Sequence, residues 1–281
     1  MKKLFTLLLG IVFSVSSYST HLMGGQISAT YINTDSLGSH YTVELDVYRD
    51  TLGIPMDTAQ MVYIYQLDSN FNYTLLGIQT ISFGVGGTMS SMSAVYGVEI
   101  YHFSDVVTFP ADGDYIIKWT DCCRNGAIIN MASPLSESMS FATALHVDSA
   151  NPNSSPTFLA DPVTYLPTNT LWQYNPLPFD PDGDSLVWSM SVPYSGGSNA
   201  FPDTVSGYEY LDDTLYSNSS APFSIDPVTG QITWSAKMVG NFVVSFGIQE
   251  YRNGSLIGIM NRDMQFVVIP DTTNAMPSIS N

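Results

Sequence analysis

The chain has 281 residues, of which 44% are hydrophobic and 12% aromatic, and it carries a formal net charge of −17 at pH 7. A composition this hydrophobic and aromatic excludes an intrinsically disordered chain. With only 8 Lys and Arg against 25 Asp and Glu, nucleic acid is excluded as a partner, because its binding depends on cationic side chains that meet phosphates. An acidic surface suits divalent cations, or simply solubility.

The first predicted element is a signal peptide over residues 1–19. Two lysines open the chain, the apolar run Leu4–Val15 follows, and Ser16–Thr20 is small and mostly polar. The apolar run is shorter than the roughly 20 residues that a membrane-spanning helix needs, and no later stretch is apolar enough. We therefore predict a secreted or cell-surface protein that is not membrane-spanning, cleaved near Ser19 or Thr20. A buried strand or core helix is the alternative, which fits the charged start less well.

Strand patterns dominate residues 20–149, where no convincing helical stripe occurs. In Tyr41–Val47 apolar and polar residues alternate, which is the period of a half-buried strand. Further runs rich in β-branched and aromatic residues are bounded by Gly, Asn, Asp or Pro; they are Met61–Leu67, Val95–Phe103, Tyr115–Trp119 and Phe141–Val147. These residues are predicted to form a β-sandwich.

A polar, turn-rich run, Asp148–Pro156, predicts a linker to a second set of strands. Alternation resumes in Leu186–Val192 and Asn241–Glu250, and Asn253-Gly254 predicts a tight hairpin before the closing strand. Residues 150–270 are thus predicted to form a second β-sandwich, and the polar run 271–281 a linker or truncated tail.

Three carboxylates form the sharpest candidate site. Asp180, Asp182 and Asp184 lie at alternate positions of a turn around Gly183. Side chains spaced in this way can direct oxygens at one point, and calcium takes six to eight oxygen ligands. The loop begins like an EF-hand, but its twelfth position is Ser191 and its flanks are strands, so an EF-hand is excluded.

Calcium is the cofactor predicted for this loop, with further oxygens from Asn151, Asn153 or Glu250 if the fold brings the linker to it. The ion would neutralise the clustered carboxylates and stiffen the connection between the two sandwiches. The alternative is a Pro-Asp-Gly turn whose carboxylates are solvated.

Cys122 and Cys123 are adjacent and are the only two cysteines. In an oxidising compartment they can form a vicinal disulfide, pair with another chain, or stay buried as thiols. A catalytic thiol needs a base and an electropositive setting. Arg124 is adjacent, whereas His102 and His146 could approach only in space, so a structural role is predicted.

Enzyme motifs are missing from the sequence, so we predict that the protein is not an enzyme. It has no nucleophile elbow, no phosphate loop and no zinc-binding His-Glu-x-x-His. A pair of carboxylates of the glycosidase type stays open, because any two can meet in a fold. Among the tryptophans, Trp188 and Trp234 are in phase with inward residues and are predicted to lie in the core, while Trp172 near Tyr174 is the most plausible exposed aromatic.

Several segments of residues 150–270 together resemble a cadherin-like repeat. Asn153–Phe158 resembles the linker between such repeats, Asp180–Leu186 their acidic loop, and Phe223–Ile232 a later strand–turn–strand. Gly240–Phe242 and Arg262–Phe266 resemble parts of the last two strands. The resemblance implies an immunoglobulin/cadherin-like β-sandwich and a calcium site of the cadherin type.

Residues 20–149 resemble a companion immunoglobulin-like domain of large secreted proteins of gliding Bacteroidetes. The resemblance rests on His21–Gly25, Val47–Asp50 and Asp121–Asn125. Those proteins are typically adhesin-like surface proteins that end in a sorting domain for type IX secretion. No such domain is visible here, so the chain is expected to be a fragment or to be exported by another route.

The function predicted from these patterns is an extracellular, adhesin-like structural or binding module of two tandem all-β sandwiches, stiffened by calcium. Surface polysaccharide or other extracellular protein domains are the predicted partners. The alternative is a carbohydrate-binding accessory module of a secreted enzyme. No ligand-binding residue is assigned.

Overall fold

The computed structural model describes residues 21–82, 89–93 and 97–271. The predicted signal peptide 1–19, and the predicted tail apart from Asp271, lie outside the described residues, as does the start of the predicted strand Val95–Phe103. Within the described ranges every long element is a strand, and the one helical element is a short 3-10 turn, η1 (Pro134–Ser136). The fold is therefore all-β, as predicted. No helix in this part of the chain has the length and apolar character needed to cross a membrane.

The strands before the predicted linker are β1 (Leu22–Asp35), β2 (Gly38–Asp50), β3 (Ala59–Leu67), β4 (Tyr73–Ser82), β5 (Met89–Ser93), β6 (Val98–Phe109), β7 (Gly113–Cys122) and β8 (Ser138–Val147). The strands after it are β9 (Thr157–Phe158), β10 (Val163–Pro167), β11 (Trp172–Tyr174), β12 (Pro178–Phe179), β13 (Ser185–Ser191), β14 (Ser224–Ile225), β15 (Ile232–Trp234), β16 (Gly240–Arg252) and β17 (Ser255–Ile269). We call β1–β8 the N-terminal half and β9–β17 the C-terminal half.

The N-terminal half is a two-layered sandwich. Strands β1, β2 and β6 form one layer, and β4, β3, β7 and β8 form the other. The alternation in Tyr41–Val47 is confirmed, because its apolar residues 41, 43, 45 and 47 are all fully buried between the layers. Trp119 of β7 stacks on Phe141 of β8 at the centre, with ring centroids 5.2 Å apart. Full burial of each such aromatic stabilises the fold by about 1.5–3 kcal/mol.

The C-terminal half has its own aromatic core, built on β13, β16 and β17 and covered by the short strands β11, β14 and β15. Trp188 and Trp234 are 2% and 0% exposed, which confirms their predicted place in the core. Trp172 differs from the expectation of an exposed aromatic. It stacks on Tyr174 at 5.5 Å and packs edge-on against Phe266 at 5.3 Å, so it is partly buried.

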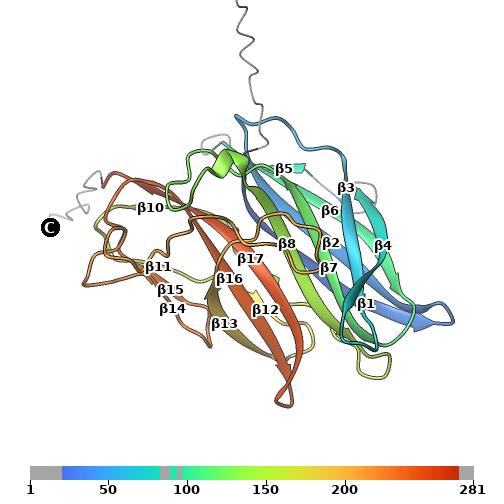
Figure 1. Cartoon of the computed structure of the whole chain (residues 1–281). Helices are drawn as coiled ribbons and strands as arrows, with labels where there is room; N and C mark the ends of the chain where they lie inside the picture. The colour runs from blue at the N-terminus through green and yellow to red at the C-terminus, as the bar shows by residue number, and fades with distance from the viewer. Residues whose placement is uncertain (1–20, 83–88, 94–96, 272–281) are drawn as a thin grey trace, which may run out of the picture.

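Strand β17 joins the two halves. It pairs with β16 along its length and with β10 in parallel, and it also pairs with β8 through Gly258–Met260 and with β1 through Arg262 and Asp263. One twelve-stranded sheet consequently runs through both halves (Figure 1). The backbone hydrogen bonds of the sheet, rather than a free linker, therefore connect the two sandwiches.

The predicted linker Asp148–Pro156 is itself packed in place. Asn153, Ser154 and Ser155 are 1%, 4% and 1% exposed. The Ser155 N–H donates to the Ala29 carbonyl at 2.8 Å, and the Ser155 hydroxyl oxygen accepts from the Ala29 N–H at 3.2 Å. Polar groups in a linker can be buried at little cost when they have hydrogen-bond partners, and β1 supplies partners for Ser154 and Ser155.

Candidate functional site: the junction between the halves

Most of the residues singled out by sequence lie where the two halves meet, which we call the junction. Two groups of side chains make it up. The first is the acidic loop with the linker and the end of β16, and the second surrounds Arg124 and Asp263. Neither group comes from one continuous segment.

The acidic loop is a local turn. Asp180 follows β12, Asp184 precedes β13, and Gly183 between them has φ +82°, a conformation that favours glycine. The Asp180 Oδ1 oxygen accepts the N–H groups of Asp182 at 3.0 Å and of Asp184 at 2.9 Å. The alternate spacing of the carboxylates is therefore partly a requirement of the turn itself.

The fold brings the linker to this loop, as the calcium prediction required. The Asp182 Oδ2 oxygen accepts the Ser154 N–H at 2.6 Å. Ligand atoms of Asp180, Asp184 and Glu250 all lie within 4.8 Å of one another. Glu250 comes from β16 and is only 2% exposed. Of the predicted ligands, these three form one cluster, while Asp182 turns to the linker backbone.

Arg252, which the sequence analysis did not consider, lies in the middle of the predicted calcium ligands. Its Nε donates to both oxygens of Asp184 at 2.9 and 3.1 Å, and its Nη2 donates to Asn153 Oδ1 at 2.9 Å. Its Nη1 donates to the backbone carbonyls of Asn151 and Pro152, both at 3.1 Å. The guanidinium thus forms ion pairs with the carboxylates of Asp184 and Asp182 and ties the linker to β16. The sequence held one signal for this role, because Arg252 is one of only 8 Lys and Arg residues and directly precedes the predicted hairpin Asn253-Gly254.

The carboxylates of Glu250 and Asp180 remain beside this arginine. In the described part of the chain, Glu250 Oε1 and Asp180 Oδ2 are buried and accept no hydrogen bond. Burial raises the pKa of Glu250 to about 9, and the neighbouring Asp180 carboxylate adds to the rise. Two carboxylates this close to each other favour a proton or a cation between their oxygens. The oxygens of Asp180 and Glu250 are therefore the ones open to a hard cation, whereas both Asp184 oxygens and the Asn153 oxygen are held by Arg252.

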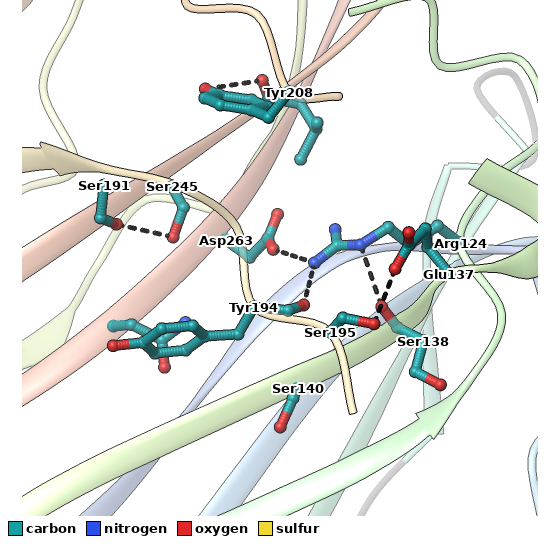
Figure 2. A network of polar contacts seen from close by, with 12 residues as sticks. Arg124, Glu137, Ser138, Ser140, Ser191, Tyr194, Ser195, Tyr208, Ser245 and Asp263 are labelled. Atoms are coloured by element: carbon teal, nitrogen blue, oxygen red, sulfur yellow. Dashed lines mark hydrogen bonds and ion pairs between the residues drawn. The ribbon is translucent and has the colours of Figure 1, made fainter. Parts of the chain in front are cut away.

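The second group centres on an ion pair between the halves. Arg124 Nη2 donates to Asp263 Oδ2 of β17 at 2.7 Å, and both side chains are fully buried (Figure 2). The same nitrogen donates to the Tyr194 carbonyl at 2.7 Å, and Nε donates to the Ser138 carbonyl at 3.2 Å. Burial raises the pKa of Asp263, and Arg124 opposes that rise. A buried pair of this kind is costly to break, because the remaining charge lies without a partner.

Cys122 and Cys123 directly precede Arg124. The structure joins their sulfur atoms in a vicinal disulfide across a cis peptide bond. The Cys123 carbonyl accepts the Leu22 N–H of β1 at 3.0 Å, and the Asn125 N–H donates to the Leu22 carbonyl at 2.9 Å. The cysteine pair thus lies where β7 turns toward Arg124, beside the start of β1.

Two further segments on which the resemblance of the N-terminal half rests, His21–Gly25 and Val47–Asp50, also reach the junction. A Cβ atom at Gly24 would lie 2.6 Å from the Asp263 carbonyl oxygen, so a side chain at this position would separate β1 from β17. The Tyr48 hydroxyl donates to Asp161 Oδ1 of the C-terminal half at 2.7 Å. Met23 and Tyr48 pack with Val163 in a small apolar cluster. Segments far apart in sequence therefore meet on one interface.

Comparison with known proteins found distant similarity to solved structures. No protein-family model and no curated protein matches the chain. Among solved structures, the two tandem V-type regions of VCBP3, a v-region-containing chitin binding protein, are 13% identical, with 88% of this chain and 100% of that chain covered and a TM-score of 0.40. The titin fragment A168169 is 9% identical, with 88% and 100% covered and a TM-score of 0.23. Dpr2 Ig1-Ig2, in complex with DIP-Theta Ig1-Ig3, is 12% identical, with 89% and 96% covered and a TM-score of 0.22.

The strand order and the two aromatic cores define the class of this protein. It is an all-β protein whose two halves are β-sandwiches that share one sheet. The fold by itself assigns no ligand, because β-sandwiches host many functions.

Proposed function

We propose that this chain is an extracellular, adhesin-like module with a structural or binding role, in which the two sandwiches form one rigid body. The shared strand β17 carries the proposal, since it pairs with β1 and β8 of one half and with β16 and β10 of the other. Surface proteins use rigid segments of this kind to hold a binding surface away from the cell. Export follows from the pattern of residues 1–19, and partners would be surface polysaccharide or other extracellular domains rather than nucleic acid. We propose no catalytic role.

Cooperative unfolding tests the rigid body. Protein recovered from outside the cell is expected to begin near residue 20. This protein is expected to unfold in urea in one transition. The reason is that neither half keeps its edge partners once β17 leaves. Tryptophan fluorescence and far-ultraviolet circular dichroism should give the same midpoint, and residues 21–149 expressed alone should lack that transition. Two separate transitions, or a stably folded fragment 21–149, would contradict the proposal.

Calcium at the junction is part of the proposal. The buried oxygens of Asp180 and Glu250, with those of Asp184, support a cation there, and Arg252 competes with it for Asp184. A cation held by these groups would stabilise the folded state by mass action.

Thermal melting with EDTA and with millimolar calcium tests this cation. The wild type is expected to melt several degrees higher in calcium, and Glu250→Gln should abolish the rise because it removes a carboxylate ligand. Asp182→Ala is the matched control. It should melt lower in both buffers, since Asp182 accepts the Ser154 N–H, yet keep the rise with calcium. An equal melting temperature of the wild type in both buffers would exclude calcium binding at the junction.

A carbohydrate-binding accessory module is the second candidate function. It is favoured by a different observation, the half-exposed ring of Phe201 beside a hollow on the face of the shared sheet.

A further inference from the structure

A loop of the C-terminal half crosses the outer face of the N-terminal half. We call residues 194–203 the strap, and Figure 1 shows this golden segment passing across β17 and β8 toward β7. The ammonium group of Lys118, on β7, donates to the Gly197 carbonyl at 3.0 Å and to the Asn199 carbonyl at 2.5 Å. The strap closes on itself through the Ser195 N–H, which donates to the Asp203 carbonyl at 2.7 Å. It is therefore a fixed loop rather than a free one.

Two hollows share Phe201, the aromatic side chain that the strap presents, among their lining residues. The first, of about 140 Å³, is lined by residues of β4, β7, β8, β17 and the strap, among them Tyr73, Asp114, His146, Phe201, Leu256 and Ile257. The second shares two of these residues and is further lined by Tyr65, Leu75, Ser198, Asn199 and Ala200. Tyr73 and Phe201 thus line both hollows, and we call this aromatic pair the ridge.

The ridge and the first hollow combine an aromatic surface with exposed polar groups. Tyr73 and Phe201 meet edge to face with ring centroids 5.6 Å apart, and Phe201 is 47% exposed. His146 Nδ1 bonds Asp114 Oδ1 at 2.7 Å, and both side chains are 46% exposed. Strand pairing fixes these two residues, since Asp114 of β7 lies opposite His146 of β8.

A hydroxylated ring has groups complementary to both parts of this combination. The C–H face of a pyranose packs on an aromatic ring, while its hydroxyl groups exchange hydrogen bonds with a carboxylate and an imidazole. The net charge of −17 repels an anionic polymer. Two hollows that share one ridge suit two units of an extended chain better than a single sugar.

We propose that the hollows beside the Tyr73–Phe201 ridge bind a neutral polysaccharide, with Asp114 and His146 positioning the hydroxyl groups of one unit. This proposal rests on the second candidate function, carbohydrate binding, and names its ligand class. It does not depend on the rigidity of the module, which is tested separately by unfolding.

Binding to a panel of neutral hexasaccharides of glucose, mannose, galactose and N-acetylglucosamine tests the site, measured by isothermal calorimetry and ligand-observed saturation transfer. At least one of them should bind, and the anionic polymer polygalacturonate should not. Phe201→Ala and Asp114→Asn should each weaken that binding about tenfold, the size expected for one aromatic contact or one hydrogen bond to a charged group. Phe201→Trp, which keeps an aromatic face, should retain it.

Phe179→Ala is the matched control, because Phe179 is 58% exposed and lines neither hollow. It should bind like the wild type, and all variants should keep the wild-type circular dichroism. The proposal is overturned if no neutral hexasaccharide binds at millimolar concentration, if polygalacturonate binds as tightly, or if Phe201→Ala binds as well as Phe179→Ala. A protein that unfolds in one transition but fails this test would keep the rigid-module function and lose the sugar site.

Discussion

Replacing Arg124 with methionine is expected to destabilise the folded protein by about 3–5 kcal/mol, the usual effect of removing one partner of a buried ion pair. The substitution leaves the Asp263 carboxylate fully buried, with its main counter-charge gone. It also removes donors from the carbonyls of Tyr194 and Ser138, which hold the strap and β8. Urea unfolding followed by fluorescence measures the change through the transition midpoint.

The double variant Arg124→Met with Asp263→Leu distinguishes the effect of an unpaired buried charge from the effect of lost packing. Because it removes both charges, it should recover much of the stability that the single variant loses. Lys237→Met is the control, since Lys237 is an exposed cation, and it should change stability by no more than about 0.5 kcal/mol. A loss for Arg124→Met no greater than that of Lys237→Met would show that the junction does not depend on this pair.

Glu250→Gln is expected to change how stability depends on pH. The pKa of Glu250 rises from 4.5 to about 9 because the side chain is buried and lies beside the Asp180 carboxylate. A carboxyl group whose pKa is higher in the folded state binds more protons there, so its contribution to stability falls as the pH rises from about 4.5 to about 9. Glutamine has the same shape and stays neutral. In EDTA the variant should therefore melt several degrees above the wild type at pH 8 and close to it at pH 4.

Melting temperatures across this pH range, in EDTA, provide the measurement. Asp271→Asn serves as the control, because it makes the same chemical change at an exposed carboxylate. Its pH profile should follow the wild type. If Glu250→Gln also follows the wild type, Glu250 is ionised in the folded protein and the cluster with Asp180 is not what makes stability fall with pH.

The strands and the core were predictable because their signals are local. Tyr41–Val47 alternates, and its apolar residues are buried in β2. Trp188 and Trp234 lie in phase with inward neighbours, and both are in the core. The acidic loop was also visible, since Pro, Asp and Gly at adjacent positions specify a turn whatever surrounds it.

The partners of the charged groups were not predictable in the same way. Arg252 enters the acidic cluster because the hairpin between β16 and β17 ends beside the linker, and this contact depends on segments that lie far from Arg252 in the sequence. Trp172 packs on Phe266 because β11 covers β17, so an aromatic expected at the surface is partly buried.

Alternation, turn chemistry and the spacing of apolar residues are enough to specify an all-β chain of sandwiches, because each depends on a few neighbouring residues. The sequence alone also indicates the acidic loop Asp180–Asp184 and the motif Cys122-Cys123-Arg124 as candidate sites. Only the tertiary structure decided that β17 joins both halves, that Arg124 pairs with Asp263, and that Glu250 shares a buried site with Asp180. The physical reason is that strand pairing and burial bring together groups that lie far apart in the sequence. The energy of a charge is set by those neighbours and not by its place in the sequence.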